Sequence, residues 1–329
     1  MKKIICLVLL CCLFLTGCGN YTEKNIIDSV ENKLNKGNGY KLSGDLSVNN
    51  NDENYNYDIE VSYKKKDYYK VVLTNKQNDH TQIILKNNDG VYVLTPLLNK
   101  SFRFQSDWPY NNSQIYLINS LINDIKNDKE RKFVKKDNQY IFNTRVKYPN
   151  NSKLVNQKII MSDNLKLEKV IVYDKNGVTA MTMNFDKIDY SPNFKKDEFN
   201  LDSIVKDDKS EALESASLDD IIYPLYIPSG TKLVNEDKVK KQNGERVIMN
   251  YDGDKSFVLV EETADVFNEF TVIPTMGEPY LVMDTFGVAT DNSLSWVSSG
   301  IEYYLISDVM SKDEMMEVAQ SISGIVSMK

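Results

Sequence analysis

Hydrophobic residues recur along this chain with two different spacings, and the spacing separates predicted helices from predicted strands. In the segment Thr22–Lys36, apolar side chains recur every three or four residues, which predicts a helix with one apolar face. Thr22 is a suitable N-cap, and Gly37 follows the last turn. The apolar positions of this helix are Ile26, Ile27, Val30 and Leu34.

The stretch 40–188 alternates polar and apolar side chains and is rich in β-branched and aromatic residues, which predicts a long antiparallel meander. One amphipathic helix interrupts it, with Ser113 as the expected N-cap and apolar residues recurring from Ile115 to Ile125. The expected strands are Tyr40–Val48, Tyr55–Tyr63, Tyr68–Thr74, Thr81–Lys86, Val91–Leu94, Lys100–Phe104, Lys132–Lys135, Gln139–Val146, Leu154–Met161, Leu165–Tyr173 and Val178–Ile188.

The last third of the chain predicts a second, smaller unit of short strands and one closing helix. Asn243-Gly244 and Asp252-Gly253 are typical hairpin turns, and Ser311-Lys312-Asp313-Glu314 has the pattern of a capping box. Charge also changes along the chain. Residues 18–205 hold 28 basic and 24 acidic side chains, whereas residues 206–329 hold 10 and 23. Two domains account for this shift better than one.

We therefore expect an α+β, β-rich protein made of four segments. Residues 1–17 form a lipoprotein signal peptide, 18–204 a β-sheet domain, 205–220 a linker, and 221–329 a small acidic α+β domain. The polar stretch from Pro192 to about Asp220 has no clear pattern, so it is either a linker or a strap wrapped over the first domain.

The N-terminus predicts export and lipid attachment. Two lysines precede the apolar run Ile4–Leu15, which spans about 18 Å as a helix and is too short to cross a bilayer. The string Leu15-Thr16-Gly17-Cys18 resembles the bacterial lipobox, in which the cysteine receives diacylglycerol and becomes the first mature residue. The alternative is a plain secretory signal with a chance cysteine. We expect a protein anchored through Cys18 at the extracytoplasmic face of the cell membrane.

The composition excludes several classes of function. A net charge of -7 opposes binding to nucleic acid, which requires a basic face. His80 is the only histidine, and all four cysteines fall within the first 18 residues. The rest of the chain therefore offers no thiolate nucleophile and no metal site built on histidines or cysteines, and we expect no metal and no cofactor.

Three short fragments match the motif set of penicillin-binding enzymes, in the right order: Ser62-Tyr63-Lys64-Lys65, Ser162-Asp163-Asn164 and Lys175-Asn176-Gly177. Ser62, however, lies in an alternating strand, whereas the nucleophile of that set opens a helix. The other two fragments fall on predicted turns, where such residues are common. We expect no catalytic residues and interpret the chain as a protein that is not an enzyme.

An aromatic cluster at the end of one predicted strand is the candidate surface for a ligand or partner. It consists of Phe102, Arg103, Phe104 and Trp108. Aromatic and arginine side chains are the residues that most often anchor protein interfaces. The alternative is that these aromatics seal the following helix onto the sheet.

These features together resemble a known family. The helix Thr22–Lys36, the meander, the segment Leu98–Ile125 (LNKSFRFQSDWPYNNSQIYLINSLINDI) and the ending Ile188–Phe199 resemble LolA-like lipoproteins of Gram-positive sporeformers, the YdcC and GerS sporulation and germination group. The resemblance covers roughly residues 20–204. The second half resembles a small domain often found behind such modules, on the strength of Ile227–Gly230, Ser295–Val297 and Ser311–Ile322.

The resemblance implies a strongly curved, incomplete antiparallel β-barrel with helices on its concave face, followed by a smaller C-terminal α+β domain. It also implies a non-enzymatic scaffold of sporulation or spore germination that supports a cortex peptidoglycan amidase. Two alternatives stay open. One is a carrier that binds lipid or lipoprotein acyl chains in the cup formed by the concave face of the curved sheet. The other is an envelope sensor similar to RseB that acts on an anti-sigma factor. An open apolar cup favours the carrier, whereas a cup plugged by its own helices favours the scaffold.

Overall fold

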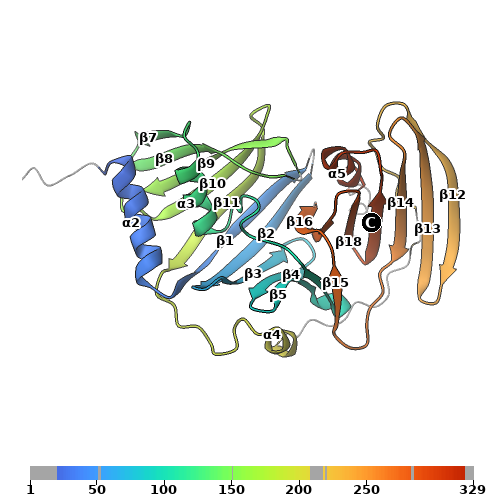
Figure 1. Ribbon diagram of the computed structural model, residues 1–329, viewed down its shortest axis with the longest axis horizontal. Helices are drawn as coiled ribbons and strands as arrows, with labels where there is room; N and C mark the ends of the chain where they lie inside the picture. Colours follow the sequence, from blue (N-terminus) through green and yellow to red (C-terminus); the bar gives the residue numbers. More distant parts are fainter. Residues whose placement is uncertain are drawn as a thin grey trace, which may run out of the picture.

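The computed structural model describes residues 21–50, 53–149, 151–207, 218, 221–282 and 285–322, and folds them into two β-sheets and four α-helices. Figure 1 shows the two sheets side by side, with helix α2 (Glu23–Lys36) at the end of the large sheet farthest from the small one. Neither sheet closes on itself, which fits an incomplete barrel. The strong curvature and the placing of the helices on a concave face remain predictions.

The large sheet has twelve strands in the order β15-β6-β5-β4-β3-β2-β1-β11-β10-β9-β8-β7. Eleven of them are the strands predicted from the first half, and every pair formed among these eleven is antiparallel. The predicted single meander is in fact two meanders, β1 to β6 and β7 to β11, joined by the pairing of β1 with β11. Their bounds are β1 Gly39–Asn50, β2 Glu53–Lys64, β3 Tyr68–Asn75, β4 Thr81–Asn87, β5 Gly90–Thr95, β6 Lys100–Phe104, β7 Lys132–Lys136, β8 Gln139–Arg145, β9 Leu154–Ser162, β10 Leu167–Asp174 and β11 Thr179–Asp189.

Two helices bury their apolar stripes in the core of the large sheet. Helix α2 begins as predicted, because Thr22 and Asn25 form a reciprocal capping box. Helix α3 spans Ile118–Asn127 and buries Leu121 and Ile125 in the same core. Amphipathic helices gain most of their stability from such packing, so both helices depend on the sheet.

The expected cap of the second helix is wrong. Ser113 does not cap α3, which begins five residues later, after Leu117, and has no side-chain cap. The Ser113 hydroxyl instead donates to Asp124 at 3.1 Å and accepts from the backbone N–H of Lys147 at 2.9 Å. These tertiary bonds satisfy Ser113, and residues 113–117 lie ahead of the helix as irregular structure with one turn.

The small sheet has seven strands in the order β12-β13-β14-β19-β18-β17-β16. The predicted closing helix α5 (Lys312–Gln320) is present, with Ser311 and Glu314 in a capping box. It buries Met315 and Val318 in the second core. The strands are β12 Thr231–Lys241, β13 Gly244–Gly253, β14 Phe257–Thr263, β16 Glu278–Val282, β17 Thr285–Ala289, β18 Ser293–Ser298 and β19 Ile301–Ile306.

One strand leaves the second half and joins the sheet of the first. β15 (Thr271–Thr275) runs parallel to β6, with Thr271 opposite Lys100 and Ile273 opposite Phe102. It covers the edge of β6 that a simple meander would leave open. The two halves of the chain are therefore interlocked through backbone hydrogen bonds.

The segment after β11 is a strap rather than an extended linker. It runs from the end of β11 to the short helix α4 (Leu201–Asp207), as Figure 1 shows. Phe199 and Ile204 pack there against Leu85 and Leu94, in a core separate from the one that holds α2 and α3. Since α4 continues past residue 204, the predicted domain boundary falls inside a helix, and that boundary remains a prediction.

Candidate functional site

The inner face of the large sheet, where α2 and α3 pack, is filled by side chains of this chain. Trp108 is 1% exposed there, and the Tyr40 hydroxyl accepts a hydrogen bond from the backbone N–H of Ile118 at 3.2 Å. The small sheet contributes to the same core, because β17 inserts Phe286 and Val288 into it. The core is thus built from both halves of the chain.

The cavity that remains beside this core has a volume of only about 80 Å³. Pockets for ligands of drug size usually measure roughly 300–1,000 Å³. The described residues therefore leave no room here for a long acyl chain, and the inner face is plugged. Its lining includes Leu46, Ile115, Tyr116, Met181, Tyr280 and Phe286.

The four residues predicted as a partner surface differ in their exposure to solvent. Phe104 is 3% exposed and belongs to the core together with Trp108, which packs edge-on against Tyr69. Phe102 is half-buried against that core. Arg103 is exposed, donates to the backbone oxygen of Asp89 and lies over the ring of Tyr92. Of the four residues only Arg103 is exposed, and a partner surface around it remains a prediction.

Polar contacts lock the two sheets together at several points. The Gln82 side chain of β4 bonds both backbone groups of Phe286: its Oε1 accepts from the N–H at 2.5 Å and its Nε2 donates to the oxygen at 3.2 Å. Asn99 Nδ2 donates to the backbone oxygen of Phe267 at 2.8 Å. At the surface, Lys153 pairs with Glu317 of α5 at 2.7 Å. These contacts join segments that lie far apart in the sequence.

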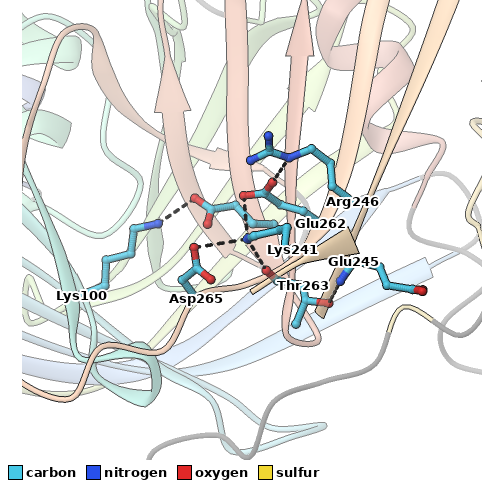
Figure 2. Close-up of polar contacts among 8 residues, drawn as sticks. Lys100, Lys241, Glu245, Arg246, Glu262, Thr263 and Asp265 are labelled. Atoms are coloured by element: carbon cyan, nitrogen blue, oxygen red, sulfur yellow. Dashed lines mark hydrogen bonds and ion pairs between the residues drawn. The ribbon is translucent and has the colours of Figure 1, made fainter. Parts of the chain in front are cut away.

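A partly buried ion cluster lies between the two sheets, and Figure 2 shows its geometry. Lys100 of β6 reaches across from the large sheet, and its Nζ lies 2.7 Å from Glu302 Oε1 of β19. Both side chains are about 5% exposed. Beside them, Lys241 pairs with Glu262 and Asp265 at 3.2 Å each. Arg246 of β13 also pairs with Glu262.

The position of the two glutamates explains why the cluster needs cations. Glu262 and Glu302 lie directly opposite each other on paired strands, and both are buried. Like charges opposite each other destabilise a sheet, and a buried charge without a partner is costly. Lys100 from the large sheet therefore neutralises a charge that the small sheet buries. Three cations match three carboxylates, which is an arrangement suited to holding the halves together.

Glu261 on the same strand points into the second core and is fully buried. Its Oε2 accepts from the backbone N–H of Ile222 at 3.0 Å, while Oε1 has no hydrogen-bond partner among the described residues. Burial raises the pKa of Glu261 to about 7; the Ile222 hydrogen bond opposes this rise and the Glu236 carboxylate adds to it. This carboxyl group changes charge near neutral pH.

Other residues singled out in the sequence are not gathered into one site. β2, which carries Ser62, is separated from β9, which ends at Ser162, by three intervening strands, and Ser62 donates to Glu198 at 2.8 Å. His80 is half-exposed in a loop, and burial lowers the pKa of its imidazole. Within the described residues, no group of three or more histidine, cysteine or acidic side chains could hold a metal ion. Cys18 lies outside the described residues.

Sequence reasoning missed both the ion cluster and the buried Glu261, although a signal for one buried acidic residue on β14 exists. Glu261 and Glu262 interrupt the otherwise apolar run of β14, so one of the two acids must face inward whichever way the strand turns. Lys100 and Glu302 gave no such signal. They are 202 positions apart and each fits an ordinary strand.

Across the described ranges, no helix is long and apolar enough to cross a membrane.

Comparison with known proteins gives no match to any protein-family model. Remote structural likenesses include a chain of the Pseudomonas aeruginosa MucA/MucB complex, at 10% identity over 90% of this chain and 97% of that one, with a TM-score of 0.32. A second is a putative outer-membrane lipoprotein-sorting protein domain from Vibrio parahaemolyticus, at 11% identity over 55% of this chain and 97% of that one, with a TM-score of 0.33. A third is a chain of the Clostridioides difficile CwlD amidase in complex with the GerS lipoprotein, at 17% identity over 54% of this chain and 98% of that one, with a TM-score of 0.23.

The sequence relationship is much closer. Over 320 residues, the chain is 36% identical to the sporulation protein YdcC of Bacillus subtilis, and the match covers 96% of this chain and 95% of that protein. The protein belongs to the family of the sporulation protein YdcC.

Proposed function

We propose that this protein is a membrane-anchored, extracytoplasmic scaffold of sporulation that holds a protein partner and does not itself catalyse a reaction. The observation that carries the proposal is the plugged inner face of the large sheet, with a remaining cavity of about 80 Å³. A carrier of acyl chains needs a cavity several times larger. A filled and interlocked body is suited instead to presenting a fixed surface to a partner.

The rigidity of the junction supports the same role. β15 is hydrogen-bonded to β6, and the Lys100–Glu302 pair is buried between the sheets. Two halves joined in this way keep one relative orientation, so a partner can contact both at once. Membership in the family of a protein named for sporulation supports the setting in which this scaffold acts.

The anchor gives the scaffold a direction. A lipidated Cys18 is followed within a few residues by Thr22, the N-cap of α2. Helix α2 lies at the end of the large sheet farthest from the small sheet (Figure 1). On this proposal the small acidic half points away from the membrane, toward a partner in the space outside the cell membrane. A cell-wall amidase, the partner implied by the family resemblance, is the partner we propose.

Partner capture tests this role. The full-length protein carrying a C-terminal affinity tag is cross-linked in sporulating cells, solubilised in detergent and purified, and the captured proteins are identified by mass spectrometry. We expect a peptidoglycan amidase to be enriched relative to the proteins captured from a matched strain that expresses the Cys18→Ala variant. Capture of no cell-wall enzyme, or equal capture by the unanchored variant, would contradict the anchored scaffold.

A further inference from the structure

A second hollow lies on the face of the large sheet opposite to the plugged core. It has a volume of about 530 Å³, within the range usual for ligand sites. Its floor is formed by β11, β1, β2 and β3, and the strap between β11 and α4 forms its other wall. We call it the outer cleft. Ser62, the first residue of the Ser62-Tyr63-Lys64-Lys65 fragment, is among its lining residues.

Two rows of side chains cross the floor of the outer cleft, set by the strand register. The first row runs Lys187, Ser43, Glu60 and Val72 across β11, β1, β2 and β3. The second row runs Asp189, Lys41, Ser62 and Lys70 across the same strands. Residues opposite each other on neighbouring strands share one face of a sheet, so each row presents a fixed order of charges and hydroxyls.

The strap is tied to this floor through one carboxylate. Glu198, whose side chain is 8% exposed, accepts from Lys41 Nζ at 2.6 Å, from Ser62 Oγ at 2.8 Å and from the backbone N–H of Lys195 at 3.0 Å. Burial alone raises the pKa of Glu198, but these hydrogen bonds outweigh burial and lower it below its ordinary value. The cleft is therefore held in shape before any ligand arrives.

Several charged groups of the cleft are left for a ligand. Among the described residues, the ammonium groups of Lys70 and Lys187 form no ion pair, and neither does the carboxylate of Glu60. Four lysines and four acidic residues line the cleft, so its charges balance. A simple anion gains little from such a lining, whereas a ligand that carries both signs of charge can pair with both.

The spacing of these groups defines the ligand further. Lys187 and Glu60 lie in one row with β1 between their strands, which places their backbones roughly 10 Å apart at the usual strand spacing. An extended peptide advances about 3.3–3.6 Å per residue, so three residues span this distance. Beyond Glu60 the cleft becomes apolar, with Val72, Ile83 and Ile204 at its end.

We propose that the outer cleft binds a short, extended peptide of about three residues with a free carboxylate and a free ammonium group. The carboxylate pairs with Lys187, the ammonium group pairs with Glu60, and a small apolar side chain beyond it contacts Val72. The hydroxyl of Ser43, midway between the two charges, faces the peptide backbone. This site does not depend on the scaffold role, because it lies on the other face of the sheet from the plugged core.

The test uses zwitterionic trialanine as the probe and the chain from residue 19 onward as the protein. Chemical-shift titration by NMR gives both the affinity and the location. We expect shifts confined to the amides of strands β11, β1, β2 and β3 beside the cleft. Lys187→Gln and Glu60→Gln should each weaken binding about tenfold, as expected for loss of a charge-assisted hydrogen bond. Dialanine, which is too short to reach both groups, should also bind more weakly.

Matched controls separate this site from general charge effects. Lys169→Gln removes a lysine of the same sheet outside the cleft and should leave the affinity unchanged. N-acetyl-trialanine amide, which has no terminal charges, should not bind.

The proposal is overturned if that blocked peptide binds as well as trialanine, or if both cleft variants bind like the wild type. It is also overturned if inorganic phosphate displaces the probe while Glu60→Gln has no effect, because that result describes an anion site. Both cleft residues are exposed, so the variants should fold, and circular dichroism checks this.

Discussion

The two cores of this protein are stabilised in different ways. The core of the large sheet is dominated by apolar and aromatic side chains, and its helices pack directly onto the strands. The small sheet instead buries three glutamates, and the charge of one of them is neutralised by a lysine from the other half. A core of apolar contacts is largely self-sufficient, whereas a buried carboxylate depends on its cation. We infer that the second half depends on the first for its stability.

The largest expected effect follows from breaking that dependence. Lys100→Met leaves the carboxylate of Glu302 buried opposite Glu262 without its cation, and should lower the free energy of unfolding by about 3–5 kcal/mol. Urea denaturation followed by tryptophan fluorescence measures this, since each core contains one buried tryptophan.

Two controls accompany the Lys100 variant. Lys153→Met removes a half-exposed ion pair across the same junction and should cost at most about 1 kcal/mol. The double variant Lys100→Met with Glu302→Gln should recover part of the loss, because no uncompensated charge remains at that position. Equal losses in the Lys100 and Lys153 variants would show that the buried pair is not what joins the halves.

The apolar core responds to a different change. Leu121 of α3 is 1% exposed in the first core, and Leu121→Ala should lower the free energy of unfolding by about 3 kcal/mol through lost contacts and a cavity. The same truncation at the exposed Leu225 should change stability by less than about 0.5 kcal/mol. If the two truncations cost the same, the inner face is not packed as described.

The buried Glu261 predicts a dependence of stability on pH in the second core. Its folded pKa of about 7 lies above the ordinary value of 4.5, so its contribution to stability is complete below pH 4.5 and is lost as the pH rises through 7. The Gln side chain of the Glu261→Gln variant cannot ionise, so this variant should be more stable than the wild type by about 3 kcal/mol at pH 8, with little difference at pH 4. Glu269→Gln, at an exposed position, serves as the control. A constant difference across this pH range would rule out the titration of Glu261.

The smallest effect on stability concerns the predicted partner surface. Arg103→Ala removes the contact with the ring of Tyr92 and the hydrogen bond to Asp89, and should cost less than about 1 kcal/mol. If Arg103 anchors a partner, the same variant should reduce partner capture in sporulating cells. Capture at the level of the wild type would restrict Arg103 to its role within this chain.

Sequence patterns predicted the local structure well and the long-range structure poorly. The eleven strands and α2 depend on periodicity and caps, which are local properties. The predicted start of α3 at Ser113 was wrong, because Ser113 forms tertiary hydrogen bonds that no local sequence pattern indicates. The pairing of β15 with β6 joins segments about 170 residues apart, with no turn between them to indicate it. For the predicted partner surface, the sequence identified the aromatic residues but not the burial of Phe104 and Trp108, because that burial depends on the packing of the whole fold.

The inner face of the large sheet is filled by the chain itself, and we propose on this basis that the protein acts by contact with a partner and not by carrying lipid. Native mass spectrometry of the Cys18→Ser protein, purified without detergent from sporulating cells that produce it, tests this most directly. We predict the mass of the polypeptide alone, with no fatty acid or phospholipid bound. A stoichiometric lipid adduct that is lost when Leu46 or Ile115 in the inner cavity is replaced by Trp would contradict the claim and establish a carrier.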